Sequence, residues 1–376
     1  MINTKIHQLN EFGQSIWLDY ISRSLIDTGK LKSLIDQGVR GLTSNPTIFD
    51  KAISSSNDYD RCIRTFGEKR KTVFEIYDEL TVKDIQDAAD NFEEVYAATD
   101  RNDGYVSLEI NPMLAHDKEK TIAEGKRLHA KVKRSNVMFK VPSTDAGFSA
   151  VTALLAEGIN VNVTLIFSLE QYLKTAEAYL KGIEKLLQRG GDARGVRSVA
   201  SVFVSRVDTL TDDLIDTRLP TLSADTQRAQ LAKLKGKAAV ANAALIYSKY
   251  LEIFSGETFI DLQRQGGGMQ RVLWGSTSTK NPAYDDIKYV TELIGEKTVN
   301  TVPEKTLQAF LEHGRIAEAL PGDIGQAQDV MRILGQFGID IDHVCRKLLE
   351  DGVAAFQESF TSLLKAIEEK ATKLGK

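Results

Sequence analysis

A lysine interrupts an apolar run in the segment VMFKVPSTDAG, residues 137–147. The run has the composition of a buried β-strand, where an ammonium group is costly because water stabilises its charged form. A lysine in apolar surroundings gives up its proton at modest cost and becomes a nucleophile for a carbonyl group. Lys140 is therefore a candidate for Schiff-base chemistry. The competing interpretation is a lysine that is ion-paired or extends its ammonium group to solvent.

Two carboxylates, Asp19 and Glu109, end other apolar segments in the same way. Schiff-base chemistry moves protons at the nitrogen and at the departing hydroxyl group, and carboxylates serve both purposes. Alternatively, both are counter-ions of Lys140. Either interpretation predicts that they lie close to the lysine.

Neutral polar residues accompany these charges: Asn45, Asn162 and Thr164. Their donors and acceptors suit the hydroxyl groups of a sugar. An Asn-Pro pair such as Asn45 and Pro46 is by itself most often only a turn.

Cationic and hydroxyl side chains follow the later apolar segments. Arg206 comes after Ser201 and Phe203, and Ser276 and Lys280 follow the next segment. Cations beside hydroxyl groups suit a phosphate, and barrels often bind phosphate after their seventh and eighth strands. For Arg206 alone, a surface ion pair is the alternative.

Eight short apolar or alternating segments must position these residues, and stretches with the 3.6-residue period of helices separate them. The segments are residues 15–21, 41–45, 106–110, 137–141, 159–167, 199–206, 271–276 and 297–302. This alternation predicts either a (β/α)8 TIM barrel or a doubly wound sheet.

The alternation of polar and apolar residues favours the barrel. Asn162 and Thr164 share one face of their segment, and Val161 and Val163 share the other. A doubly wound sheet buries both faces and shows near-continuous apolar runs. We therefore expect a polar barrel interior, with the active site where the strands end.

Two regions predict additional helices, after the second strand and at the C-terminus. Residues 46–105 exceed what one helix needs, and residues from about 314 to 376 show helical spacing of apolar side chains. No Pro/Gly/Ser-rich linker precedes the second region, so we expect residues 1–376 to form a single barrel domain.

Composition restricts the partners. A net charge of −4 without a basic run argues against nucleic acid, and no segment is apolar enough to span a membrane. Cys62 and Cys345 form no CxxC motif and the N-terminus lacks a signal-peptide pattern, which favours the cytoplasm. No metal is predicted, because the histidines show no HxH or HExxH spacing. They are His7, His116, His129, His313 and His343.

Over nearly its whole length the sequence resembles the transaldolase family, particularly its longer bacterial form. The stretches that carry the resemblance are WLDYISR, GLTSNPTIF, VSLEINP, MFKVPSTDAG, INVNVTLIFS, SVFVSRVD and LWGSTSTKNPAY. The resemblance implies a class I aldolase-type barrel in the pentose phosphate pathway. It also implies that no cofactor is needed, and it does not indicate an oligomeric state.

The resemblance implies a role for each catalytic candidate. Lys140 would attack the ketone of sedoheptulose 7-phosphate or fructose 6-phosphate. Glu109 and Thr164, with a water molecule, would move protons during imine formation, and Asp19 would take the proton of the C4 hydroxyl. The dihydroxyacetone unit left on the lysine would pass to glyceraldehyde 3-phosphate or erythrose 4-phosphate.

The remaining candidates would bind substrate. Asn45 and Asn162 would hold hydroxyl groups of the three-carbon unit, and Ser201 and Phe203 would line the site. Arg206, Ser276 and Lys280 match the family's phosphate-contacting region. The sequence departs here from the shorter transaldolases that it resembles, because those proteins have an arginine at the position that aligns with Lys280. A lysine offers a point charge and no bidentate fork.

Three other functions remain open from the sequence. The first is fructose 6-phosphate aldolase, which the chain also resembles in its fold and its lysine. Those aldolases differ at two matching positions: they have glutamine in place of Glu109 and tyrosine in place of Phe203. Lys140 could alternatively anchor pyridoxal phosphate as an imine. A sugar-phosphate-binding protein without activity is the third alternative, because fold alone does not determine function.

Overall fold

The computed structural model describes residues 3–375, and its centre is a closed barrel of eight parallel strands that follow one another in chain order. Pairing of the last strand with the first closes the barrel. The strands are β1 (Gln14–Leu18), β2 (Gly41–Thr43), β3 (Tyr105–Glu109), β4 (Val137–Pro142), β5 (Val161–Ile166), β6 (Ser198–Phe203), β7 (Arg271–Gly275) and β8 (Thr298–Val302). The predicted (β/α)8 barrel is confirmed, and each strand overlaps one of the eight predicted segments.

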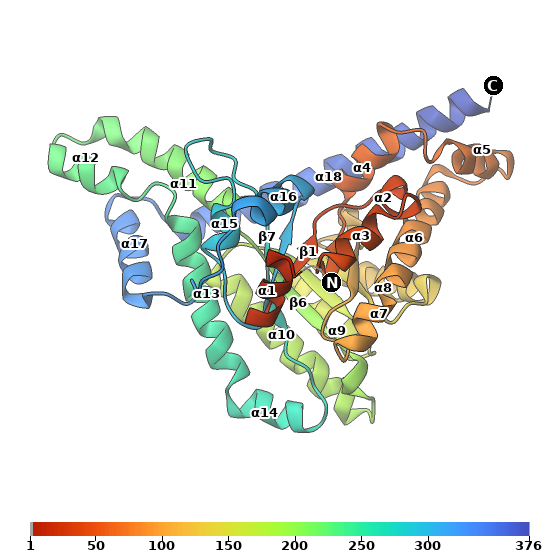
Figure 1. Ribbon diagram of the computed structural model, residues 1–376, viewed down its shortest axis with the longest axis horizontal. Coiled ribbons are helices and arrows are strands. Elements are labelled where there is room, and N and C mark those ends of the chain that lie inside the picture. Colours follow the sequence, from red (N-terminus) through yellow and green to blue (C-terminus); the bar gives the residue numbers. More distant parts are fainter. Residues whose placement is uncertain (1–2, 376) are drawn as a thin grey trace.

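Helices surround the barrel (Figure 1). The α-helices are α1 (Lys5–Phe12), α2 (Arg23–Asp27), α3 (Lys30–Asp36), α4 (Pro46–Ser54), α5 (Asp60–Glu68), α6 (Val73–Asn91), α7 (Glu93–Ala98), α8 (Lys118–Val132), α9 (Asp145–Leu155), α10 (Leu169–Gln188), α11 (Ser205–Arg218), α12 (Asp225–Ala232), α13 (Ala238–Phe254), α14 (Glu257–Arg264), α15 (Lys288–Thr291), α16 (Glu304–His313), α17 (Ile324–Gln336) and α18 (Ile341–Leu374). Three short 3-10 helices are η1 (Pro112–Leu114), η2 (Ala193–Gly195) and η3 (Leu219–Thr221).

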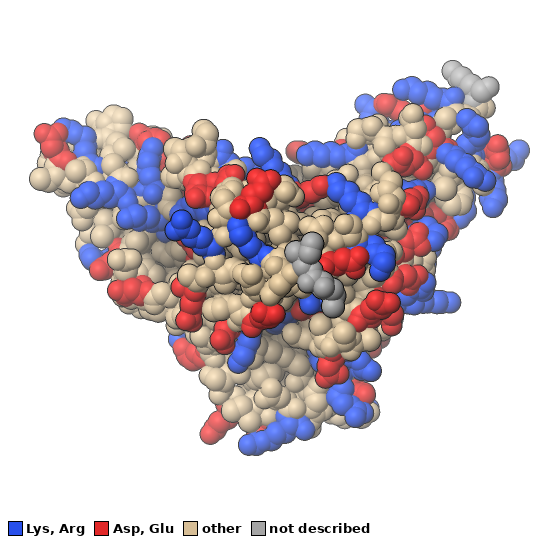
Figure 2. Space-filling view, in the orientation of Figure 1, with Lys and Arg blue, Asp and Glu red and all other residues tan. Residues whose placement is uncertain are grey.

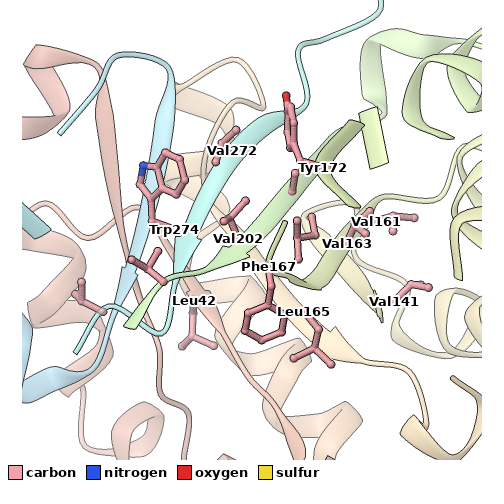
Figure 3. Packing of buried hydrophobic residues seen from close by; sticks show 14 of the residues in the cluster. Leu42, Val141, Val161, Val163, Leu165, Phe167, Tyr172, Val202, Val272 and Trp274 are labelled. Atoms are coloured by element: carbon pink, nitrogen blue, oxygen red, sulfur yellow. The ribbon is translucent and has the colours of Figure 1, made fainter. Parts of the chain in front are cut away.

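Apolar side chains on the outer face of the strands form the main core with the helices. Figure 3 shows Val141, Val163, Val202 and Trp274, from four strands, within this cluster. All four are at most 1% exposed. Their alternation with inward-facing residues is the period of two seen in the sequence.

One layer of the barrel interior is apolar, which corrects the expectation of a polar interior. Side chains fill the interior of such barrels in layers. The apolar layer consists of Trp17, Tyr96, Tyr105, Met138, Val199, Leu273 and Val299. Polar side chains lie on both sides of it. Ser15, Asp103 and Arg271 form a buried hydrogen-bonded group toward the amino-terminal ends of the strands, and the candidate site residues lie at the carboxyl ends.

Gly41 is required by this packing, because a β-carbon there would lie 2.6 Å from two ring atoms of Trp17. We expect Gly41→Ala to lower the free energy of unfolding by about 1–3 kcal/mol through overpacking. Gly67→Ala is the matched control: it lies in α5 with nothing within 4 Å of its added carbon. Alanine there favours the helix by about 0.5–1 kcal/mol. Thermal denaturation of both variants checks the contrast, and equal melting temperatures would contradict it.

Helices are inserted in two of the loops between strands. Helices α4 to α7 follow β2, as predicted, and α11 to α14 follow β6. The sequence pattern made no prediction for the second insertion. In Figure 1, α11 and α12 form one arm of the molecule, and α5 with the end of α18 forms the other.

The C-terminal region is helical in two parts, α17 and α18, whereas residues 314–323 are not helical and Lys376 lies outside the described residues. Helix α18 packs against α4, α5, α6 and α11 and reaches β5. It runs across the molecule between the two arms (Figure 1). Its buried side chains include Phe356, Phe360, Leu363 and Ile367, which the helical spacing predicted.

Charged side chains of both signs are interspersed on the face seen in Figure 2. None of the helices described within residues 3–375 has the length and apolar character that crossing a membrane requires.

Candidate active site

A cavity of about 320 Å³ opens beside the carboxyl ends of the strands. Nine of the eleven residues predicted for the site line it: Asp19, Asn45, Lys140, Thr164, Ser201, Phe203, Arg206, Ser276 and Lys280. Glu109 and Asn162 do not line it, but each is the register partner of Lys140 on a neighbouring strand. The barrel thus brings together residues that are far apart in sequence.

Lys140 is buried in β4, with its side chain 5% exposed. Its Nζ donates a hydrogen bond to the carbonyl oxygen of Ser44 at 3.0 Å and lies 3.1 Å from Oε2 of Glu109. The ion pair follows from the register of β3 and β4, which sets the two residues side by side. The ion-pair interpretation therefore describes the geometry around Lys140, and the lysine also lines the cavity.

Glu109 is buried next to this lysine. Burial raises the pKa of its carboxyl group, because a charge is poorly solvated there, and the positive charge of Lys140 opposes that rise. Oε2 of Glu109 is the atom that contacts Lys140, whereas Oγ1 of Thr164 has no hydrogen-bond partner among the described residues. The hydroxyl group of Thr164 is therefore available for a substrate or water.

Asp19 lies one residue beyond the end of β1, so the predicted strand extends too far. Its Oδ1 accepts a hydrogen bond from Oγ1 of Thr43 at 2.8 Å, and that hydroxyl also lies 2.7 Å from Oγ1 of Thr301. Burial raises the pKa of Asp19, whereas the charge of Lys140 and the bond from Thr43 oppose the rise. The carboxyl group is thus oriented and retains affinity for a proton, as an acid–base group requires.

The sequence analysis missed Thr43 and Thr301, although both line the cavity. Thr43 stands two residues before Asn45, so the strand period places both on one face, and this signal could have identified it. No comparable signal marks Thr301.

The amide of Asn162 contacts side chains of two neighbouring strands. Its Nδ2 donates to Oγ of Ser107 at 3.0 Å, and its Oδ1 accepts from Oγ of Ser201 at 2.6 Å. Ser201 lines the cavity, so Asn162 orients that hydroxyl from behind. Asn45 caps α4, where its Oδ1 accepts from the backbone N–H of Ile48 at 3.0 Å, and its amino group remains for other contacts.

Arg206 lies in the first turn of α11 and not at the end of β6, because the strand ends at Phe203. It is half-buried, and burial lowers the pKa of its guanidinium group. No carboxylate of residues 3–375 lies within ion-pair distance, so the surface ion pair considered from the sequence is absent from the described structure. A half-buried cation without a counter-ion suits an anionic ligand.

Ser276 and Lys280 complete this end of the cavity. Ser276 has a left-handed backbone with φ of 53°, and its Oγ lies 3.0 Å from Oγ of Ser205. Nζ of Lys280 donates to Oγ of Ser278 at 2.8 Å. Lys51 of α4 also lines the cavity. Sequence analysis missed it because its position on an amphipathic helix is typical of a solvated lysine.

A separate group of potential metal ligands lies on the surface. Asp285, Asp286 and His313 offer ligand atoms within 4.8 Å of one another, and all three are exposed. None of them lines the cavity around Lys140. His313 Nε2 and Asp286 Oδ1 are 2.9 Å apart, so a hydrogen bond accounts for this proximity.

A parallel (β/α)8 barrel with a buried lysine beside carboxylates, in a cavity at the carboxyl ends of its strands, defines the class of lysine-dependent aldolase-type enzymes. Comparison with known proteins narrows the class. The family model described as transaldolase/fructose-6-phosphate aldolase matches residues 16–367. The chain therefore belongs to this family.

Individual relatives agree along the whole chain. The transaldolase of Trichodesmium erythraeum (strain IMS101) is 44% identical, over 100% of this chain and 99% of the relative. Transaldolase 2 of Nostoc punctiforme is 41% identical, over 98% of both chains. The transaldolase of Saccharopolyspora erythraea is 44% identical, again over 98% of both. The resemblance drawn from the sequence is confirmed.

Proposed function

We propose that this enzyme transfers a dihydroxyacetone unit from a ketose phosphate to an aldose phosphate through a Schiff base on Lys140. The observation that carries the proposal is that the buried Lys140 lines the cavity and lies 3.1 Å from Glu109, close enough for direct proton exchange. Fructose 6-phosphate or sedoheptulose 7-phosphate is the donor, and glyceraldehyde 3-phosphate or erythrose 4-phosphate is the acceptor.

Imine formation uses Glu109 and Thr164. The neutral amine of Lys140 adds to the ketone carbon, and the oxygen atom of the ketone must then leave as water. The protonated carboxyl group of Glu109 supplies a proton for that step, which its raised pKa favours. The unpartnered hydroxyl of Thr164 holds the water molecule that carries it.

Bond cleavage uses Asp19. Its carboxylate takes the proton of the C4 hydroxyl, the C3–C4 bond breaks, and its electron pair enters the iminium to form an enamine. The aldose phosphate departs with the new carbonyl group. For transfer, the enamine carbon attacks the acceptor aldehyde, and Asp19 returns the proton to the new alkoxide. Water then adds to the iminium carbon, the carbon–nitrogen bond breaks, and the new ketose phosphate leaves while Lys140 regains its free amine.

Substrate binding divides the cavity into two ends. Asn45 and Ser201 contact hydroxyl groups of the three-carbon unit, Asn162 orients Ser201 from behind, and Phe203 packs beside the unit. Arg206, Ser276 and Lys280 bind the phosphate at the other end, with Lys51 as a further cation.

We also propose that the whole chain is one domain, because α18 packs on the barrel and its helices. A cytoplasmic location is proposed because Cys62 and Cys345 are free thiols.

Borohydride trapping tests the Schiff base directly. The protein is reduced with fructose 6-phosphate present and then without sugar, and the labelled peptide is identified by mass spectrometry. We expect a three-carbon adduct on the peptide that contains Lys140. Lys51→Met is the control, because it removes another amine of the cavity and should leave this adduct. An adduct on Lys51 or none at all would contradict the proposal.

The phosphate assignment predicts a selective defect in Arg206→Ala. Charged hydrogen bonds contribute about 1.5–3 kcal/mol, so kcat/KM for glyceraldehyde 3-phosphate should fall about 10- to 100-fold. The value for unphosphorylated glyceraldehyde should change much less. Arg64→Ala, an exposed arginine outside the cavity, is the control. Equal losses with both acceptors would assign Arg206 to something other than the phosphate.

A further inference from the structure

The side chain of Phe356 reaches the cavity from the C-terminal helix, 216 positions after Lys140 in the numbering. Its ring centre lies 5.8 Å from Nζ of Lys140. Phe356 is 5% exposed and lines the cavity. Most of the lining around it is polar, so this ring is an apolar wall next to the reacting nitrogen.

The helix approaches the barrel closely because of Gly352. A β-carbon at this position would lie 3.0 Å from Cδ2 of Leu165. Leu165 has a left-handed backbone with φ of 59°, where the pairing of β5 and β6 shifts register between Val163 and Ile166. The glycine and the irregular strand end therefore bring α18 against the rim of the barrel.

Three polar contacts hold this part of α18. Sγ of Cys345 donates to the carbonyl oxygen of Phe167 at 3.3 Å, and Nε2 of Gln357 donates to that of Pro112 at 3.2 Å. The hydroxyls of Thr47 and Ser359 are 2.8 Å apart. These contacts lie before and after Phe356 along the helix, so the position of the ring is fixed by its surroundings.

We propose that Phe356 shields the three-carbon enamine on Lys140 from water and thereby determines how much of it is transferred and how much is released. This inference rests on the proposed Schiff-base function. An aromatic ring beside the nitrogen also favours the positively charged iminium form. Excluding water from a reactive intermediate is a recognised use of a closed apolar wall.

The competing reaction requires water twice. Water first gives a proton to the enamine carbon, which converts the enamine to an iminium. The hydroxide or a second water molecule then adds to the iminium carbon, the carbon–nitrogen bond breaks, and dihydroxyacetone leaves while Lys140 regains its free amine. Transfer instead forms a carbon–carbon bond to the acceptor aldehyde. A wall that keeps water away from the enamine carbon slows the release of dihydroxyacetone. Hydrolysis at the iminium carbon is common to both outcomes, because the transfer product also leaves Lys140 in this way.

The experiment compares two side chains of similar length and opposite polarity, Phe356→Met and Phe356→Gln. Each variant reacts with fructose 6-phosphate and erythrose 4-phosphate, and both free dihydroxyacetone and the transfer product are quantified. We expect the ratio of release to transfer to be about tenfold higher in Phe356→Gln than in Phe356→Met, because the amide admits water. Phe356→Met should stay within about threefold of the wild type.

Phe360→Ala is the control for general loosening of the helix. Phe360 lies one turn further along α18, is 3% exposed and packs edge-on against Tyr77, with ring centres 5.1 Å apart. It does not line the cavity, so its loss should leave the ratio unchanged. Circular dichroism and borohydride trapping on Lys140 verify that each variant is folded and forms the imine.

Two results would overturn the inference. One is an equal ratio in Phe356→Gln and Phe356→Met, and the other is the same increase in Phe360→Ala. Both leave trapping on Lys140 intact in the wild type. Absence of trapping in the wild type itself would instead contradict the proposed function.

Discussion

Replacing Lys140 with methionine is expected to lower the rate of transfer by more than about a thousandfold, because no other side chain can take over a covalent nucleophile in the same geometry. Borohydride should then trap no sugar on the protein. Methionine matches the length of the lysine stem, so the cavity stays filled. Coupled assays of transfer and mass spectrometry after reduction measure both effects. Residual transfer near the wild-type rate would remove Lys140 from the mechanism.

The same variant is expected to be less stable, with a pH dependence of known sign. Loss of Lys140 from the buried ion pair leaves Glu109 without a counter-ion. Breaking such a pair typically lowers the free energy of unfolding by about 3–5 kcal/mol. Without the opposing charge of Lys140, burial raises the pKa of Glu109 further. A folded-state pKa above the unfolded value means that the folded protein binds the proton more tightly. Its stability therefore falls as pH rises through that range.

Thermal denaturation at pH 5 and pH 8 checks this expectation. The difference in melting temperature between Lys140→Met and the wild type should be larger at pH 8. At that pH, the buried Glu109 must either carry a charge or take up a proton from a solution of low proton concentration. The double variant Lys140→Met/Glu109→Gln removes the carboxylate and should recover most of the loss. A double variant no more stable than Lys140→Met would show that lost packing, and not the unpaired carboxylate, causes the destabilisation.

Asp19→Asn is expected to separate imine formation from bond cleavage. An amide cannot take the proton of the C4 hydroxyl, so turnover should fall about 10²- to 10⁴-fold. Lys140 and Glu109 are intact in this variant, and the imine should still form. Borohydride should therefore trap mainly the six-carbon ketose phosphate in place of the three-carbon unit. A three-carbon adduct formed at the wild-type rate would assign the proton transfer to another group.

The same change is expected to stabilise the protein at neutral pH. Burial raises the pKa of Asp19, so its carboxylate destabilises the folded state increasingly as pH rises above the unfolded pKa. An asparagine carries no charge and still accepts the hydrogen bond from Thr43. The melting temperature of Asp19→Asn should exceed that of the wild type at pH 7, with the difference decreasing at pH 4. Asp58→Asn, at an exposed position outside the cavity, should show no such trend.

The rival functions left open by the sequence are tested by these measurements. Release of free dihydroxyacetone in place of transfer would indicate an aldolase, the other activity in the name of the matched family. Yellow absorbance of the purified protein would indicate pyridoxal phosphate. The relatives named here are all transaldolases and align over nearly the full chain, so transfer is the expected outcome.

The sequence by itself determined the strands, their order along the chain and Lys140 as the candidate nucleophile. Alternation along β5 and the charge within β4 report which face of a strand packs on the helices and which points into the barrel, and this is a local property of neighbouring residues. Turn residues after each strand placed Asn45, Glu109 and Lys140 near strand ends. Because parallel strands of a barrel end on the same side, this information was enough to predict one site.

Only the tertiary structure decided what surrounds the lysine. The register of β3 and β4 sets Glu109 beside Lys140, Thr43 orients Asp19, and α18 places Phe356 over the nitrogen. Periodicity shows that a side chain is buried, but not which distant surface covers it. The apolar layer inside the barrel, which the sequence analysis predicted to be polar, has the same cause. Contacts between residues far apart in sequence depend on packing, and packing is decided only when the barrel closes.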